Sequence, residues 1–198
     1  RGLALGLFAL ALLAKPAAIA CLPLVLLWDQ RPWREKWLRY APWALLAVAC
    51  VLLAKQFQPD AQQEYVPSLV ERAWISLDAL GSYTQNLLVP LDLCADPGRS
   101  PSRVLAQLDL ARLALAPLLA LVLLLWDRQP QRVGFALANS FCALLPVLGW
   151  VSFGFQNTST VADRYAYLAL LGPALWISQR QQRLSQLAIA QGLLACAG

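Results

Sequence analysis

The chain has 198 residues, of which 59% are hydrophobic and 14% charged, and the charges fall in short clusters between apolar runs. A soluble domain of this length does not show that pattern, so the composition excludes an ordinary soluble protein and indicates an integral membrane protein. The net charge of +5 does not require a nucleic acid partner, because basic loops are what membrane topology demands.

Several kinds of site are missing from the composition. The chain has no histidine and its five cysteines show no Cys-x-x-Cys spacing, so we expect no metal site of the usual zinc type. Neither a glycine-rich nucleotide-binding motif nor a Ser/His/Asp set can be built, and we expect no cofactor here. The sequence lacks methionine and stops within an apolar run, so we expect an internal piece of a longer protein.

Seven apolar segments are the expected helices of one transmembrane domain over residues 1–198. They are 2–14, 16–28, 40–54, 104–126, 133–150, 165–178 and 184–198. Most are shorter than the roughly 20 residues that span a bilayer squarely, so flanking Trp, Tyr and Arg complete them or the bilayer is locally thin. The predicted fold class is therefore all-α, a polytopic helical membrane bundle.

Basic residues set the expected orientation of these helices. The 28–39 segment is rich in Arg and Lys, which places it in the cytoplasm by the positive-inside rule. Segments 55–103 and 151–164 then become external loops. The junction of Lys15 and Pro16 also lies outside, and Pro16 is expected to open a helix, because proline is tolerated in the first helical turn.

The first external loop contains one stretch with helical periodicity, residues 68–88. One face is apolar: Leu69, Val70, Ala73, Trp74, Leu77, Leu80, Thr84, Leu87 and Leu88. The other face is polar: Glu71, Arg72, Ser76, Asp78, Ser82, Gln85 and Asn86. We expect an amphipathic helix that lies along the outer membrane surface and ends at Pro90. Farther along, Asp109 and Arg112 are spaced to pair on one helix face.

The strongest chemical signal is an acid next to a base, Asp163 and Arg164. Uncharged apolar stretches flank the pair on both sides, at 133–162 and 165–179. Because a charge at the bilayer centre costs roughly 3 kcal/mol or more, the pair must lie at the membrane surface or in a wet cavity. Two interpretations stay open: Arg164 binds an anion such as phosphate, or it anchors a helix end among headgroups. We expect Asp163 to orient Arg164.

Charged and aromatic residues expected on the external side form the candidate substrate-binding set. The set is Lys15, Asp92, Asp96, Asp163, Arg164, Tyr165 and Tyr167. Each residue other than the pair also has a structural interpretation. Lys15 is a second phosphate contact or a snorkelling lysine, and the tyrosines are sugar ligands or interfacial aromatics. The two aspartates line an acceptor groove or terminate helices in turns.

Four stretches, in the same order, resemble the membrane domain of the TMTC-type proteins and their bacterial relatives. TMTC-type proteins are transmembrane O-mannosyltransferases that carry tetratricopeptide repeats. The stretches are Leu12–Asp29, Asn86–Asp96, Leu144–Gly149 and Val161–Gly172. The resemblance implies a GT-C fold hexosyltransferase that moves a sugar from a polyprenyl-phosphate carrier to a protein acceptor. It also implies a bacterial inner-membrane protein with an extracytoplasmic site.

The chain departs from the family pattern in three ways. The acidic residue that the family uses in its first external loop is expected upstream of Arg1. The family's Lys-Glu pair is replaced by Lys15 and Pro16. No repeat with a 34-residue period is visible. Two other functions stay open: a polysaccharide ligase or flippase, and a non-catalytic membrane scaffold for a repeat domain, which we expect to have its outer cavity filled by side chains.

Overall fold

A computed structural model describes residues 2–57, 65–91, 93–150 and 158–181 of the protein. All regular elements within these ranges are helices, and none of these residues is in a β-strand. The predicted all-α class is confirmed. Among the described helices, Trp33–Leu53 is the one that is long and apolar enough to cross a membrane. Three shorter apolar helices accompany it: Gly2–Ala14, Pro16–Trp28 and Leu110–Trp126.

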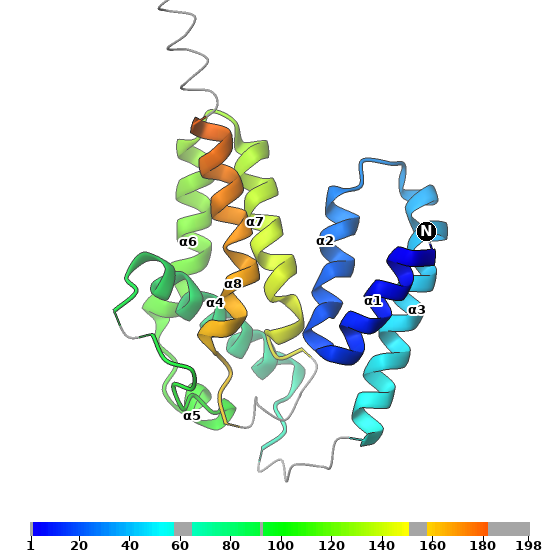
Figure 1. Cartoon of the computed structure of the whole chain (residues 1–198). Helices are drawn as coiled ribbons and strands as arrows, with labels where there is room; N and C mark the ends of the chain where they lie inside the picture. The colour runs from blue at the N-terminus through cyan, green and yellow to red at the C-terminus, as the bar shows by residue number, and fades with distance from the viewer. Residues whose placement is uncertain (1, 58–64, 92, 151–157, 182–198) are drawn as a thin grey trace, which may run out of the picture.

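The helices form two groups that meet along α2 and α7 (Figure 1). The N-terminal group contains α1 (Gly2–Ala14), η1 (Pro16–Ala20), α2 (Cys21–Trp28) and α3 (Trp33–Phe57). The second group contains α4 (Leu69–Leu88), α5 (Pro101–Ala106), α6 (Leu110–Trp126), α7 (Pro130–Leu144), η2 (Leu145–Val147), η4 (Asp163–Tyr165) and α8 (Ala166–Ala169). A further helix over 171–181 follows α8. In Figure 1, α6, α7 and α8 stand side by side, and α4 lies across their lower end.

The expected break between the first two helices is present. Lys15 has an extended backbone with φ −154° and ψ 116°, and Pro16 opens η1. A residue before proline is driven out of the helical region by the proline ring, which explains the extended conformation of Lys15. The chain therefore bends at Lys15 and exposes its side chain.

Several helix boundaries differ from the expected ones. The expected helix 40–54 begins earlier, at Trp33, because the residues after Pro32 are good helix formers. The expected helix 104–126 is divided into α5 and α6. The division occurs because Asp109 has an extended backbone and caps α6 with its carboxylate, which accepts from the Ala111 N–H at 2.9 Å.

Two further expected helices are present, but each is divided into two helical segments. The expected helix 133–150 becomes α7 followed by the short η2, and 165–178 becomes α8 followed by the helix over 171–181. The expected helix 184–198 lies outside the described residues.

The predicted helix over 68–88 is present as α4, and several of its polar residues lie against the protein. Ser76, Asp78 and Ser82 are buried, whereas Leu69 is 76% exposed and Leu88 is 53% exposed. Ser68 and Glu71 form a capping box at its start. Ile75, Ala79 and Tyr83 are buried on the same side, so α4 buries a mixed polar and apolar face and leaves leucines at both of its ends exposed.

Two glycines allow helices to approach closely where the site is built. A Cβ at Gly81 of α4 would lie 2.0 Å from the carbonyl oxygen of Arg112 in α6. A Cβ at Gly172 would lie 2.1 Å from Ser140 Oγ of α7. Because real Cβ atoms do not come this close to other atoms, a side chain at either position would push the helices apart. Gly81 therefore sets the distance between the polar face of α4 and Arg112.

Candidate functional site at the α4 end of the bundle

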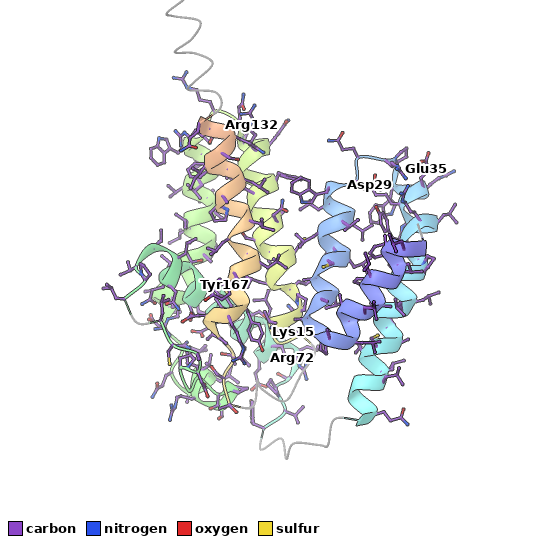
Figure 2. The ribbon with its side chains drawn as sticks, viewed as in Figure 1. Lys15, Asp29, Glu35, Arg72, Arg132 and Tyr167 are labelled. Carbon is purple, nitrogen blue, oxygen red and sulfur yellow. The ribbon has the colours of Figure 1, made fainter. Side chains whose placement is uncertain are left out.

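The charged side chains gather at two opposite ends of the helices (Figure 2). Asp29, Glu35 and Arg132 lie toward one end, and Lys15 and Arg72 toward the other. The second end also carries α4, α5 and η4, as Figure 1 shows. This end, which we call the α4 end, collects the described residues that the sequence indicated for substrate binding.

Two cations from distant parts of the chain meet at one aromatic ring. Lys15 Nζ lies 5.8 Å from the centroid of the Tyr165 ring, and Arg164 Cζ lies 5.1 Å from it. An aromatic face attracts cations within about 6 Å, which holds both side chains near the ring. Lys15 and Arg164 are exposed, and Tyr165 is half-buried. We call these three residues the Tyr165 cluster.

The hydrogen bonds of Asp163 join it to α4 and the segment after α4, whereas the sequence suggested that it orients Arg164. Its Oδ1 accepts a hydrogen bond from Asn86 Nδ2 at 2.7 Å, and its Oδ2 accepts from the Cys94 N–H at 2.6 Å. Both carboxylate oxygens are therefore engaged with α4 and with the segment after it. Asp163 ties η4 to these elements, and that function was not foreseen from the sequence.

A polar cavity of about 130 Å³ is lined in part by Asp163, and no residue of the Tyr165 cluster lines it. It is formed by the polar side of α4, the 93–100 segment, the start of α6 and the segment before η4. The lining residues are Ser82, Gln85, Asn86, Cys94, Pro97, Arg99, Arg112, Val161 and Asp163. The cavity is therefore lined by two guanidinium groups, one carboxylate, two side-chain amides and one hydroxyl group.

A buried carboxylate stands behind this cavity. The Asp78 side chain is 1% exposed, and its Oδ2 accepts a hydrogen bond from Arg99 Nη2 at 2.5 Å. Arg112 Nη1 lies 3.7 Å from Oδ1 of the same carboxylate. The expected pairing of Asp109 with Arg112 is therefore wrong, because Asp109 caps its own helix and Arg112 faces α4 instead. We call Asp78, Arg99 and Arg112 the Asp78 cluster.

Backbone hydrogen bonds and one tyrosine fix the wall next to the Asp78 cluster. The Thr160 N–H donates to the Arg99 carbonyl at 2.8 Å, and the Ala162 N–H donates to Tyr83 Oη at 3.3 Å. Burial raises the pKa of Tyr83 to about 12. The phenol keeps its proton near neutral pH, so it acts as a structural hydrogen-bonding group and not as a base.

The remaining candidates lie away from the cavity or outside the described residues. Tyr167 is 74% exposed and does not line the cavity. Asp96 is exposed, and its Oδ1 accepts from the Gly98 N–H at 2.9 Å. This is the turn-forming interpretation of Asp96. Asp92 lies outside the described residues.

The sequence analysis did not identify Arg99 as a site residue. It placed Asp78 and Asn86 on the polar face of a surface helix and paired Arg112 with Asp109. The available signal was the polar face of the 68–88 helix, which must have polar partners wherever it is buried. Within the described ranges, no three His, Cys, Asp or Glu side chains are grouped so as to hold a metal ion.

Comparison with known proteins adds no assignment. The sequence matches no protein-family model, no curated protein and no solved structure.

Proposed function

We propose that the chain is part of a polytopic membrane glycosyltransferase of the GT-C type, which moves a sugar from a polyprenyl-phosphate carrier to an extracytoplasmic acceptor. The observation that carries the proposal is the Tyr165 cluster, where two exposed cations meet at one ring. A carrier phosphate needs cations at the membrane surface, and the Tyr165 cluster supplies two of them. The resemblance to the TMTC-type family supports a protein acceptor.

The distribution of apolar surface supports a membrane location. Large apolar side chains are exposed along α1, α3 and α6, among them Leu3, Leu52 and Leu125. Exposed apolar patches of this extent mark surfaces that another apolar phase covers. The outward leucines of α4 fit a helix lying at the bilayer surface with its polar side on the protein. Several helices shorter than a full span would then cross a locally thin bilayer.

Arg164 has the chemistry that a leaving phosphate requires. Negative charge grows on the carrier phosphate as the sugar is released, and a guanidinium can donate two charge-assisted hydrogen bonds to it. An interaction that strengthens with this charge lowers the barrier as well as holding the substrate. Lys15, the residue before η1, adds a second positive charge at the Tyr165 ring.

The scaffold alternative is less well supported. A non-catalytic scaffold is expected to have its outer end filled by side chains, whereas the α4 end contains a cavity of about 130 Å³. A ligase or flippase shares the same charge pattern, and no feature of the described residues favours it.

The proposal is tested by binding of a polyprenyl phosphate to the full-length protein in lipid nanodiscs. We expect Arg164→Ala and Lys15→Ala each to weaken binding about tenfold, the effect of losing one charge-assisted contact. Arg128→Ala is the matched control, because Arg128 is an exposed arginine in the turn before α7, close in sequence to Arg132, which lies at the opposite end of the helices (Figure 2). Equal binding by all three variants would rule out the Tyr165 cluster as the phosphate site.

The proposed orientation has a separate test in cysteine labelling. Cys94 is exposed in the segment between α4 and α5. Cys21, which is also exposed, lies in the apolar helix α2, and the half-buried Cys50 and Cys142 lie in α3 and α7. An impermeant maleimide applied from outside the cell should therefore label Cys94 alone among these four. Labelling of Cys94 only after the membrane is permeabilised would place the α4 end in the cytoplasm.

A further inference from the structure

We propose that the cavity beside the Asp78 cluster binds a single acidic sugar unit, with its acid group at Arg99 and Arg112 and its hydroxyl groups at the other polar lining residues. The residues of this site belong to four stretches that the sequence separates, and none of them is part of the Tyr165 cluster. The ligand is thus a second one, distinct from the carrier phosphate.

Arg99 and Arg112 keep hydrogen-bond donors for a ligand. Both contact the Asp78 carboxylate, each through one terminal nitrogen. Their Nε atoms are buried, but each side chain is still 23% exposed, so a ligand can reach the terminal nitrogens. A planar guanidinium group matches a carboxylate or phosphate group. These two arginines therefore suit an oxyanion.

The rest of the lining suits hydroxyl groups. Asp163 accepts from Asn86 and from the Cys94 N–H, and each of its oxygens keeps a further lone pair that can accept from a ligand. The side-chain amides of Gln85 and Asn86 each contain a donor and an acceptor. With Asp163 and Asp78 counted together, the two carboxylates balance the two guanidinium groups. A bare anion would share the cavity with the Asp163 carboxylate, whereas a ligand that is acidic at one end and hydroxylated at the other matches the whole lining.

The size and position of the cavity limit the ligand further. At about 30 Å³ per water molecule, a cavity of about 130 Å³ has room for about four waters, so it admits no more than a single sugar unit. Its exposed lining residues are Gln85, Cys94 and Pro97. These residues lie on α4 and on the segment that follows it, so the cavity opens to the surface of the protein there.

If the proposed sugar transfer holds, the acidic sugar is the acceptor or part of it, and this one step rests on the proposed function. Binding itself does not depend on transfer. A positive binding result with no transfer would refute the proposed function and leave the cavity assignment standing. Transfer without binding of an acidic sugar would refute the cavity assignment and leave the proposed function standing.

The test is binding of glucuronate to the full-length protein in nanodiscs, measured by isothermal titration calorimetry, with glucose and inorganic phosphate compared at equal ionic strength. We expect glucuronate to bind at least about tenfold more tightly than either, because glucose lacks the acid and phosphate lacks the hydroxyl-bearing ring. Equal binding of glucuronate and phosphate would show a simple anion site. Equal binding of glucose, or no binding of glucuronate, would overturn the proposal directly.

Three variants locate the binding. Arg112→Gln should lower glucuronate affinity at least about tenfold. Gln85→Trp should block the cavity with little effect on folding, because Gln85 is exposed, so it serves even if Arg112→Gln folds poorly. Arg103→Gln is the control, since Arg103 is exposed on α5 and does not line the cavity. Unchanged glucuronate affinity in Gln85→Trp would place the ligand elsewhere.

Discussion

Two groups of cations lie at the α4 end, and they differ in what holds them. In the Asp78 cluster, Arg99 and Arg112 are largely buried around a carboxylate that is 1% exposed. In the Tyr165 cluster, Lys15 and Arg164 are exposed beside an aromatic ring. A buried charge must be compensated for the chain to fold, whereas an exposed charge is already solvated. The first group should therefore govern stability and the second should govern carrier binding.

Removing the buried carboxylate should have the largest effect on folding. Asp78→Ala leaves two part-buried guanidinium groups uncompensated, and we expect a loss of about 3–5 kcal/mol of unfolding free energy. Asp96→Ala is the control, because Asp96 is an exposed acid in a turn at the same end. Chemical denaturation in detergent measures both variants. A loss below about 1 kcal/mol for Asp78→Ala would mean that water, and not Arg99 and Arg112, compensates the charge.

The contact of α4 with α6 should come next. Gly81→Ala places a Cβ 2.0 Å from the Arg112 carbonyl oxygen, so the helices must separate. We expect a loss of about 1–3 kcal/mol, the usual cost of overpacking. Gly134→Ala in α7 is the matched control, since a Cβ there meets nothing within 4 Å and alanine is the better helix former. If Gly81→Ala were as stable as Gly134→Ala, the close approach of α4 to Arg112 would be wrong.

An exposed carboxylate should show a smaller effect that depends on pH. Glu71 accepts from the Tyr65 hydroxyl at 2.5 Å and from the Ser68 N–H at 2.7 Å. The hydrogen bond from Tyr65, followed by those with Ser68, lowers the pKa of Glu71 from its ordinary value of 4.5. Because the folded-state pKa is the lower one, Glu71 stabilises the fold above about pH 4.5, and this contribution is lost as the pH falls through the lowered pKa.

The comparison of melting temperatures between pH 7 and pH 3 checks this prediction. The wild-type protein should lose more stability on acidification than Glu71→Gln, which has no carboxylate to protonate. Tyr65→Phe should lie between the two, because it removes the hydrogen bond with the largest effect on the pKa. Identical pH profiles for wild type and Glu71→Gln would contradict it.

The sequence predicted those features that depend on local pattern. Helices follow from apolar runs, the bend at Lys15 follows from Pro16, and α4 follows from its 3.6-residue periodicity. The Tyr165 cluster was found in part, because isolated charges between apolar runs are conspicuous in a linear sequence. The geometry of this cluster was not predicted, because the approach of Lys15 to Tyr165 depends on how distant segments of the chain pack.

The Asp78 cluster shows why the rest could not be predicted. Asp78, Arg99 and Arg112 come from α4, the segment before α5 and the first turn of α6. The nearest opposite charge in sequence suggested that Arg112 pairs with Asp109. The extended backbone of Asp109 ends that possibility by making it a helix cap, and the glycine at position 81 brings α4 to Arg112. Both effects are tertiary, and periodicity carries no information about them.

The most direct test of the central claim is the rate of sugar transfer from a polyprenyl-phosphate sugar by the full-length protein in liposomes, compared between wild type and Arg164 variants. We expect Arg164→Lys to lower the rate about tenfold, because lysine keeps the charge but loses the fork, and Arg164→Ala to lower it further. Asp163→Asn should have a smaller effect. Stability should change by less than about 0.5 kcal/mol in both Arg164 variants, since the side chain is exposed. Transfer at the wild-type rate by a normally folded Arg164→Ala protein would show that Arg164 is a membrane anchor and contradict the account.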